Sequence, residues 1–345
     1  MSCQTSINKN PGSEGFLESI TRLRVLIIGD VMIDSYLWGK VDRISPEAPV
    51  PVVLVNHRDK RLGGAANVAL NVQSLGATPI LCSVIGSDRE GKEFLGLLSK
   101  NGLSSEGIVI SESRITTIKH RVMSGSHHLI RLDAEQDSLL DETENKALKE
   151  KLFSLLSQID VVIFEDYDKG VLSENLIKEV VGFCNERKIP TVVDPKKRNF
   201  LSYKNVSLFK PNKKELKEGL KLDSGLNEPD ELKTAVAQLR AVLQPELVLI
   251  TLSDQGVYVE SEKENCHIPA HKREISDVSG AGDTVISVAA VCYALGLSPD
   301  RIAAIANLAG GIVCEYVGVV PIDKNVLLKE ILRLNLLPDV AGIAQ

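Results

Sequence analysis

The octapeptide Asp277-Val278-Ser279-Gly280-Ala281-Gly282-Asp283-Thr284 stands directly before a long apolar segment and decides the fold. Small residues such as Gly280 and Gly282 let a ligand approach the backbone closely. The free N–H groups at a helix start, together with the positive end of the helix dipole, bind anions. We therefore predict a helix over 283–295, with an anion site at its first turn and the Asp283 carboxylate beside it.

A lone aspartate at a helix start can also be a simple cap. A cap, however, does not require the Gly-Ala-Gly sequence that precedes Asp283. Phosphoryl transfer does require N–H donors around the transferring group and a carboxylate that faces the nucleophilic hydroxyl. The octapeptide as a whole therefore favours a catalytic site over a cap.

Short apolar runs alternate with helical patterns along the chain. The strand candidates lie at 25–28, 80–85, 161–164, 191–193 and 247–252. The helix candidates lie at 65–75, 90–101, 142–156, 174–187, 231–243 and 299–316. Continuous apolar runs are typical of strands buried on both faces of a parallel sheet. The alternation predicts an α/β fold in three layers, with helices on both faces of a central, mostly parallel sheet.

Two segments do not fit a parallel sheet. Residues 50–55 form a strand candidate that follows the first strand without a helix between the two. Residues 114–133 resemble two strands joined by a turn at Ser124-Gly125-Ser126. We predict that they form a small antiparallel sheet beside the main domain, a lid made from about 41–57 and 112–132. Residues 1–20 are predicted to be a flexible leader before a single large domain over 21–345.

Bulk composition excludes several classes of protein. The net charge of −6 and the lack of a long Lys/Arg stripe argue against a nucleic-acid partner. No apolar run is long enough for a membrane helix, and the N-terminus lacks the apolar core of a signal peptide. Six cysteines without a CxxC pair suggest neither zinc nor disulfides. We expect reduced thiols, no membrane partner and a cytoplasmic location.

The octapeptide resembles the second signature of the ribokinase (PfkB) family of sugar kinases. This resemblance implies that Asp283 is the catalytic base and that the amides of Gly280, Ala281 and Gly282 form the anion hole. It also implies a ribokinase-like fold and the use of ATP with Mg²⁺. A need for a monovalent cation such as K⁺ stays open.

The stretch Gly63-Gly64-Ala65-Ala66-Asn67 resembles the family's first signature, in which a glycine pair opens a helix beside the sugar. The resemblance implies that Gly63, Gly64 and Asn67 contact the sugar. Asp34 matches the family aspartate that binds sugar hydroxyls. Asp30 could bind the ligand or cap a turn, and the two interpretations weigh equally.

Three further segments suggest the nucleotide site. Lys210-Pro211-Asn212-Lys213-Lys214-Glu215 resembles the family's Asn-x-x-Glu motif, which implies that Asn212 and Glu215 help to place ATP and the water shell of Mg²⁺. The same spacing suits a capping box, and both roles are compatible. The turn with Thr251, Ser253 and Gly256 corresponds to a family turn under the ATP phosphates, with a plain hairpin turn equally possible. Asn307 lies where relatives have residues near adenine.

Further stretches look like the bacterial heptose 7-phosphate kinases within this family. They are residues 29–36, 43–52, 129–133, 166–170 and 194–196. The resemblance implies phosphorylation of D-glycero-D-manno-heptose 7-phosphate at C1, in the synthesis of precursors for lipopolysaccharide. It implies substrate roles for Asp34, Arg131, Asp166, Lys169 and Lys196. A phosphorylated substrate needs cations outside the anion hole, and some of these basic residues, Lys119, Arg121 and Arg198 included, could hold its phosphate. For any single one of them, however, a solvated surface charge is the favoured interpretation.

Two rival functions remain at this stage. One is another kinase of the same family, acting on ribose, fructose, a phosphosugar or a nucleoside. The other is a sugar- or nucleotide-binding regulator without turnover. A dinucleotide-dependent dehydrogenase is disfavoured because GxGxxG does not follow the first strand. We also expect a homodimer through the lid, and a kinase without the nucleotidyltransferase domain that some heptose kinases carry, because the chain ends at Gln345.

Overall fold

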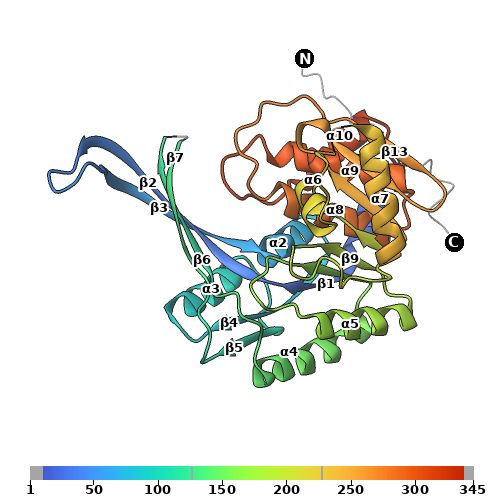
Figure 1. Cartoon of the computed structure of the whole chain (residues 1–345), viewed down its shortest axis with the longest axis horizontal. Helices are drawn as coiled ribbons and strands as arrows, with labels where there is room; N and C mark the ends of the chain where they lie inside the picture. The colour runs from blue at the N-terminus through green and yellow to red at the C-terminus, as the bar shows by residue number, and fades with distance from the viewer. Residues whose placement is uncertain (1–10, 126, 227, 338–345) are drawn as a thin grey trace, which may run out of the picture.

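A nine-stranded sheet forms the centre of the molecule (Figure 1). The computed structural model describes residues 11–125, 127–226 and 228–337. In spatial order the strands are β13 (Asn265–Ile268), β12 (Val257–Glu260), β11 (Leu247–Thr251), β10 (Leu208–Phe209), β9 (Thr191–Asp194), β8 (Val161–Glu165), β1 (Arg24–Gly29), β4 (Thr78–Gly86) and β5 (Ile108–Ser111). All neighbouring pairs from β11 to β5 are parallel, and β12 pairs antiparallel with both β11 and β13. The predicted mostly parallel sheet is confirmed.

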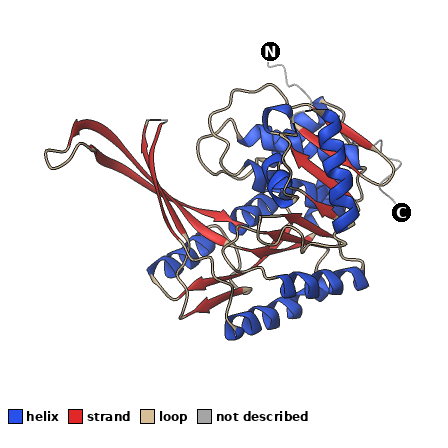
Figure 2. Cartoon of the chain, viewed as in Figure 1, coloured by secondary structure: helices blue, strands red, loops and turns tan. Residues whose placement is uncertain are grey.

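Helices cover both faces of this sheet (Figure 2). One layer holds α1 (Pro11–Thr21), α2 (Ala65–Leu75), α3 (Arg89–Lys100), α8 (Ala281–Ala294), α9 (Pro299–Val313) and α10 (Lys324–Arg333). The other holds α4 (Glu142–Leu155), α5 (Glu174–Arg187), α6 (Lys213–Gly219) and α7 (Pro229–Leu243). The strands are buried between two apolar clusters, which is why their sequences are continuous apolar runs. No helix in the described residues has the length and apolarity needed to cross a membrane.

A second sheet of four strands extends away from this body (Figure 1). Its strands are β2 (Val31–Ile44), β3 (Pro51–Gly64), β6 (Ile118–Ser124) and β7 (His127–Ala134). We call it the small sheet. It starts earlier than the predicted segments because β2 follows β1 after Asp30 alone. It is also not wholly antiparallel, because β2 and β6 pair in parallel. Ser126, in the predicted turn, lies outside the described residues.

The predicted leader is wrong in part. Residues 1–10 lie outside the described residues, but 11–21 form α1. Phe16 and Ile20 have the four-residue spacing that places two side chains on one helical face, and both are buried in the core cluster of the α2–α8 layer. The burial of this apolar face attaches the segment to the domain.

Candidate active site

Asp283 lies in the first turn of α8, where the helix points its amino end at the carboxyl edge of the large sheet. Gly280 is the cap residue with φ of 80°, a conformation that favours glycine, and a Cβ there would come within 3.0 Å of Asn67 Nδ2. The N–H of Ala281 donates to the carbonyl of Val278 at 3.3 Å. Ala281 is therefore a weaker candidate for the anion hole than predicted. The N–H groups of Gly282 and Asp283 have no acceptor within the described residues, so they are available to an anion.

Two side chains hold the Asp283 carboxylate. Asn67 Nδ2 donates to Oδ2 at 2.7 Å, and the Tyr167 hydroxyl donates to Oδ1 at 2.8 Å. Asn67 is fully buried on α2 and orients the Asp283 carboxylate, a role beyond its predicted contact with sugar. Burial raises the pKa of Asp283 to about 6, although both hydrogen bonds lower it. A carboxylate with this pKa is ionised at neutral pH and can accept a proton.

Replacing Tyr167 with Phe should move the acid limb of the kcat/KM profile to higher pH. The hydroxyl lowers the pKa of Asp283, so its loss raises that pKa and protonates the base at pH values where the wild type is active. At pH 6 we expect activity to fall on the order of tenfold, since a hydrogen bond to a charged group contributes roughly 1.5 kcal/mol or more.

Tyr203→Phe is the matched control for this prediction. Tyr203 also donates a buried hydroxyl to an aspartate, Asp166 Oδ2 at 2.7 Å, but Asp166 makes no contact with Asp283. Substrate groups that titrate affect both variants equally. An unchanged acid limb in Tyr167→Phe, or an equal movement in Tyr203→Phe, would show that the Tyr167 hydroxyl does not tune the base.

A row of polar side chains lines the carboxyl ends of β8 to β10 and faces α8. Lys210 Nζ pairs with Asp194 Oδ2 at 2.8 Å, and both side chains are almost fully buried. Glu165 is in register with Asp194 on the neighbouring strand. Burial, Asp194 and Asp283 together raise the pKa of Glu165 well above its usual range, which favours its neutral form. Sequence reasoning did not select Glu165, Asp194 or Lys210, although each follows an apolar run.

This row fits the water shell of a magnesium ion. Both oxygens of Glu165 and Asp194 Oδ1 have no hydrogen-bond partner in the described part of the chain. Such buried oxygens normally bind water or an ion. No cluster of three or more His, Cys, Asp or Glu in the described residues is arranged to bind a metal directly. The residues thus suit Mg²⁺ that keeps its waters and arrives with a nucleotide.

The residues predicted to bind sugar lie where the small sheet joins the main body. Arg121 on β6 pairs with Asp34 on β2, and its guanidinium also lies over the Tyr36 ring, 5.4 Å from the centroid. A Cβ on Gly63 would come within 2.2 Å of Asp34 Oδ2, which explains the glycine there. Gly64, with φ of 59°, ends β3 and caps α2. Arg121 was predicted only as one of several cations that could hold a substrate phosphate, and its ion pair places it directly beside Asp34.

Two aspartates have structural roles. Asp30 is buried and accepts the backbone N–H groups of Tyr167, Lys169 and Val171 at 2.8 to 3.0 Å, so the turn-capping interpretation holds. Asp166, predicted to bind substrate, points the other way. It accepts hydrogen bonds from Asn199 and Tyr203, and burial raises its pKa to about 6. Its carboxylate is turned away from Asp283 because neighbouring residues of an extended chain alternate faces.

The predicted nucleotide residues are only partly brought together. Asn212 and Glu215 form a capping box at α6, and Asn212 pairs with Thr251 in a β-bridge. Lys196 links Glu215 of α6 to the surroundings of Asp283. Its Nζ pairs with Glu215 and lies 5.2 Å from the centroid of the Tyr167 ring. Burial opposes its charge, but Asp194 and Glu215 raise the pKa of Lys196.

Four predicted residues make other contacts. Ser253 and Gly256 form the turn of the β11–β12 hairpin, in which Gly256 N–H donates to Ser253 O at 3.1 Å. Asn307 on α9 donates to Pro269 O at 3.0 Å, so it holds the segment after β13. Arg131 on β7 is exposed and pairs with Asp133 of its own strand.

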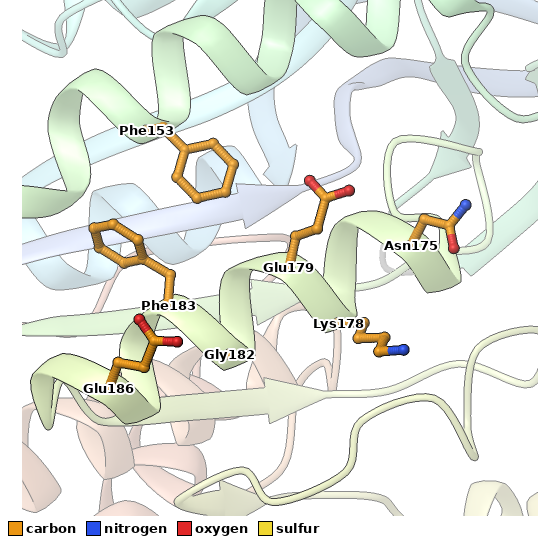
Figure 3. Close-up of a pocket in the computed structure, with 7 residues that line it drawn as sticks. All are labelled: Phe153, Asn175, Lys178, Glu179, Gly182, Phe183 and Glu186. Carbon is orange, nitrogen blue, oxygen red and sulfur yellow. The ribbon is translucent and has the colours of Figure 1, made fainter.

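A separate hollow of about 560 Å³ lies between α4 and α5 (Figure 3). Phe153, Lys178, Glu179 and Phe183 are among its lining residues. Both helices belong to the layer opposite α8, and none of the predicted site residues lines the hollow. It is therefore distinct from the site around Asp283.

Comparison with known proteins decides the family. Residues 22–325 match the model of the pfkB family carbohydrate kinases. The chain belongs to this family. Members of this family are carbohydrate kinases, which are phosphotransferases with an alcohol group as acceptor.

The pfkB kinase is similar to curated proteins named bifunctional protein HldE. It is 38% identical over 325 residues to that of Methylobacillus flagellatus and 40% identical over 304 residues to that of Desulfatibacillum aliphaticivorans, which covers 92% and 87% of this chain. It spans 66% and 61% of those relatives, less than two thirds of their length.

Solved structures confirm the ribokinase-like fold. Phosphofructokinase-2 from Escherichia coli matches with a TM-score of 0.74 at 18% identity, over 91% of this chain and 99% of that chain. Ribokinase from Thermotoga maritima matches with a TM-score of 0.65 at 18% identity, over 90% and 99%.

Proposed function

We propose that this pfkB kinase transfers the γ-phosphoryl group of ATP to the C1 hydroxyl of D-glycero-D-manno-heptose 7-phosphate and forms the 1,7-bisphosphate. The observation that carries the chemistry is Asp283, a buried carboxylate held by Asn67 and Tyr167 at the open start of α8. The resemblance of residues 29–36 and 43–52 to heptose 7-phosphate kinases, and the likeness to HldE proteins, support the acceptor.

The site suggests how its residues act. Asp283 takes the proton from the attacking hydroxyl while the N–H groups of Gly282 and Asp283 stabilise the charge on the transferring phosphoryl group. Lys210 and Lys196 supply positive charge on the nucleotide side, and Asp34 with Arg121 orients the sugar. Mg²⁺ bound with ATP would supply further charge neutralisation. Closure of the small sheet over the sugar would exclude water.

A substrate panel tests the acceptor. ADP release from Mg-ATP should be fastest by kcat/KM with heptose 7-phosphate, compared with ribose, fructose and fructose 6-phosphate. Faster turnover of another sugar would rule out heptose 7-phosphate as the acceptor, but the proposed kinase activity would stand. Because the similar Escherichia coli phosphofructokinase-2 has been solved with potassium, the panel should be run with and without K⁺.

We further propose that two copies pair through the small sheet. Leu54 on β3 and Ile130 and Leu132 on β7 are more than half exposed, although they are apolar. An exposed apolar sheet with open edges favours association with another copy.

Ile130→Lys should weaken this dimer by roughly tenfold to hundredfold in Kd, since burying one such side chain contributes about 1.5–3 kcal/mol. Sedimentation across a concentration series measures the change. Ile275→Lys, at an exposed apolar residue outside the small sheet, is the control. A wild-type protein that stays monomeric at high concentration would remove the proposal.

A further inference from the structure

Two lysines from separate segments of the chain share one carboxylate. Lys119 Nζ on β6 donates to Glu135 Oε2 at 2.9 Å, and Lys169 Nζ donates to Glu135 Oε1 at 2.7 Å. Each carboxylate oxygen of Glu135 therefore accepts from one ammonium group. Lys119 also donates to Asp133 at 3.0 Å, and Arg131 pairs with the same aspartate. The group of Lys119, Lys169, Arg131, Asp133 and Glu135 has a net charge of +1.

The backbone of each lysine is held in place by hydrogen bonds or strand pairing. Lys119 lies in register with Asp34 on the neighbouring strand, and the backbone N–H of Lys169 donates to the buried Asp30 at 3.0 Å. Both lysine side chains are less than a fifth exposed. Glu135, in contrast, follows the end of β7 and its side chain is 30% exposed. Both cations are thus carried by backbone that a strand or a buried aspartate holds, whereas the anion between them lies just beyond its strand and is partly exposed.

This pair lies beside the proposed catalytic centre. Lys169 is two residues from Tyr167, whose hydroxyl contacts the base. Lys119 is two residues along β6 from Arg121, which pairs with Asp34, and two residues of a strand span about 7 Å. A sugar that contacts Asp34 and Asp283 could therefore extend one end to the two lysines.

We propose that Lys119 and Lys169 bind the phosphate group that the sugar already carries, and that Glu135 occupies this phosphate subsite until the substrate displaces it. The inference rests on the proposed phosphosugar substrate and specifies how that substrate is recognised. A phosphate dianion carries more charge than a carboxylate and offers more acceptor oxygens. Partly exposed ion pairs contribute little to stability, so release of Glu135 into water costs little.

Substitutions at the two kinds of residue should have opposite effects. Lys119→Met and Lys169→Met should each raise KM for the phosphosugar about tenfold or more, with KM for ATP unchanged, because a charged hydrogen bond is lost. Glu135→Gln should lower KM for the phosphosugar, because the internal competitor loses its charge. A purely structural role for Glu135 predicts an unchanged or higher KM.

Inorganic phosphate provides a second readout. It should compete with the phosphosugar in the wild type and compete less in the two lysine variants. Lys149→Met and Glu179→Gln, which remove a similar ion pair (2.7 Å) between α4 and α5, are the matched controls.

The outcomes separate this inference from the proposed function. If no phosphosugar is phosphorylated, the proposed function fails and the subsite fails with it. If the phosphosugar is phosphorylated but its KM is unchanged in the lysine variants, or is raised in Glu135→Gln, the subsite alone is wrong.

Discussion

Asp283→Asn should lower kcat by a factor on the order of 10² to 10⁴, the range that general-base catalysis contributes. The amide cannot accept the proton of the attacking sugar hydroxyl, while the size of the side chain is kept. Its one oxygen can still accept from Asn67, and its Nδ2 can donate to the Tyr167 hydroxyl. KM for ATP should change little, because the N–H donors at the start of α8 remain. Steady-state kinetics at pH 8, where the wild-type carboxylate is ionised, measures the effect.

The unfolding temperature separates lost chemistry from lost structure. The pKa of Asp283 is raised from 3.8 to about 6 in the folded protein, so the folded protein binds this proton more tightly than the unfolded chain. Ionisation of this group therefore lowers the stability of the fold as the pH rises through this range, and the loss is complete above it. A neutral amide removes that buried charge. We expect Asp283→Asn to unfold at the wild-type temperature or higher at pH 8. A variant that keeps more than a tenth of wild-type kcat would exclude Asp283 as the base.

Lys210→Met should lower the free energy of unfolding by ~3–5 kcal/mol, the cost of breaking a buried ion pair from one side. Burial opposes the charge of Lys210, but Asp194 and Glu215 raise its pKa, so it is a cation in the folded protein. Without it, Asp194 is left buried beside Glu165 and Asp283 with no opposing charge on Oδ2. Urea unfolding at pH 7 measures the loss.

The double variant Lys210→Met with Asp194→Asn is the decisive comparison. It removes both charges, so it should recover much of the stability that the single variant loses. Lys149→Met breaks a partly exposed pair with Glu179 and should cost less than about 1 kcal/mol. An equal loss in Lys210→Met and Lys149→Met would show that the pair at the strand ends is not a buried, coupled pair.

The local structure could be predicted from the sequence where the residues concerned lie close together in the chain. Gly280, Gly282 and Asp283 lie within four consecutive residues, and the start of a helix fixes how such residues are placed relative to one another. The same holds for the capping box of Asn212 and Glu215. Buried parallel strands were predictable because both of their faces are apolar.

Contacts between distant segments were not predictable in this way. Tyr167 and Asp283 are 116 residues apart, and their hydrogen bond depends on how β8 and α8 pack. Asp166 was chosen over Glu165 although alternation along an extended chain places Glu165 with Ile163, on the face that packs against α8. Attention to this two-residue period would have selected Glu165, Asp194 and Lys210, which share that face at adjacent strand ends.

The position of the newly transferred phosphate tests the central proposal most directly. The protein, Mg-ATP and heptose 7-phosphate would be incubated together, and the product would be analysed by phosphorus NMR and by its reducing capacity. We predict a second phosphate on the C1 oxygen and loss of the reducing end, with neither seen for Asp283→Asn. A second phosphate on any other oxygen, or no transfer to this sugar, would contradict the account.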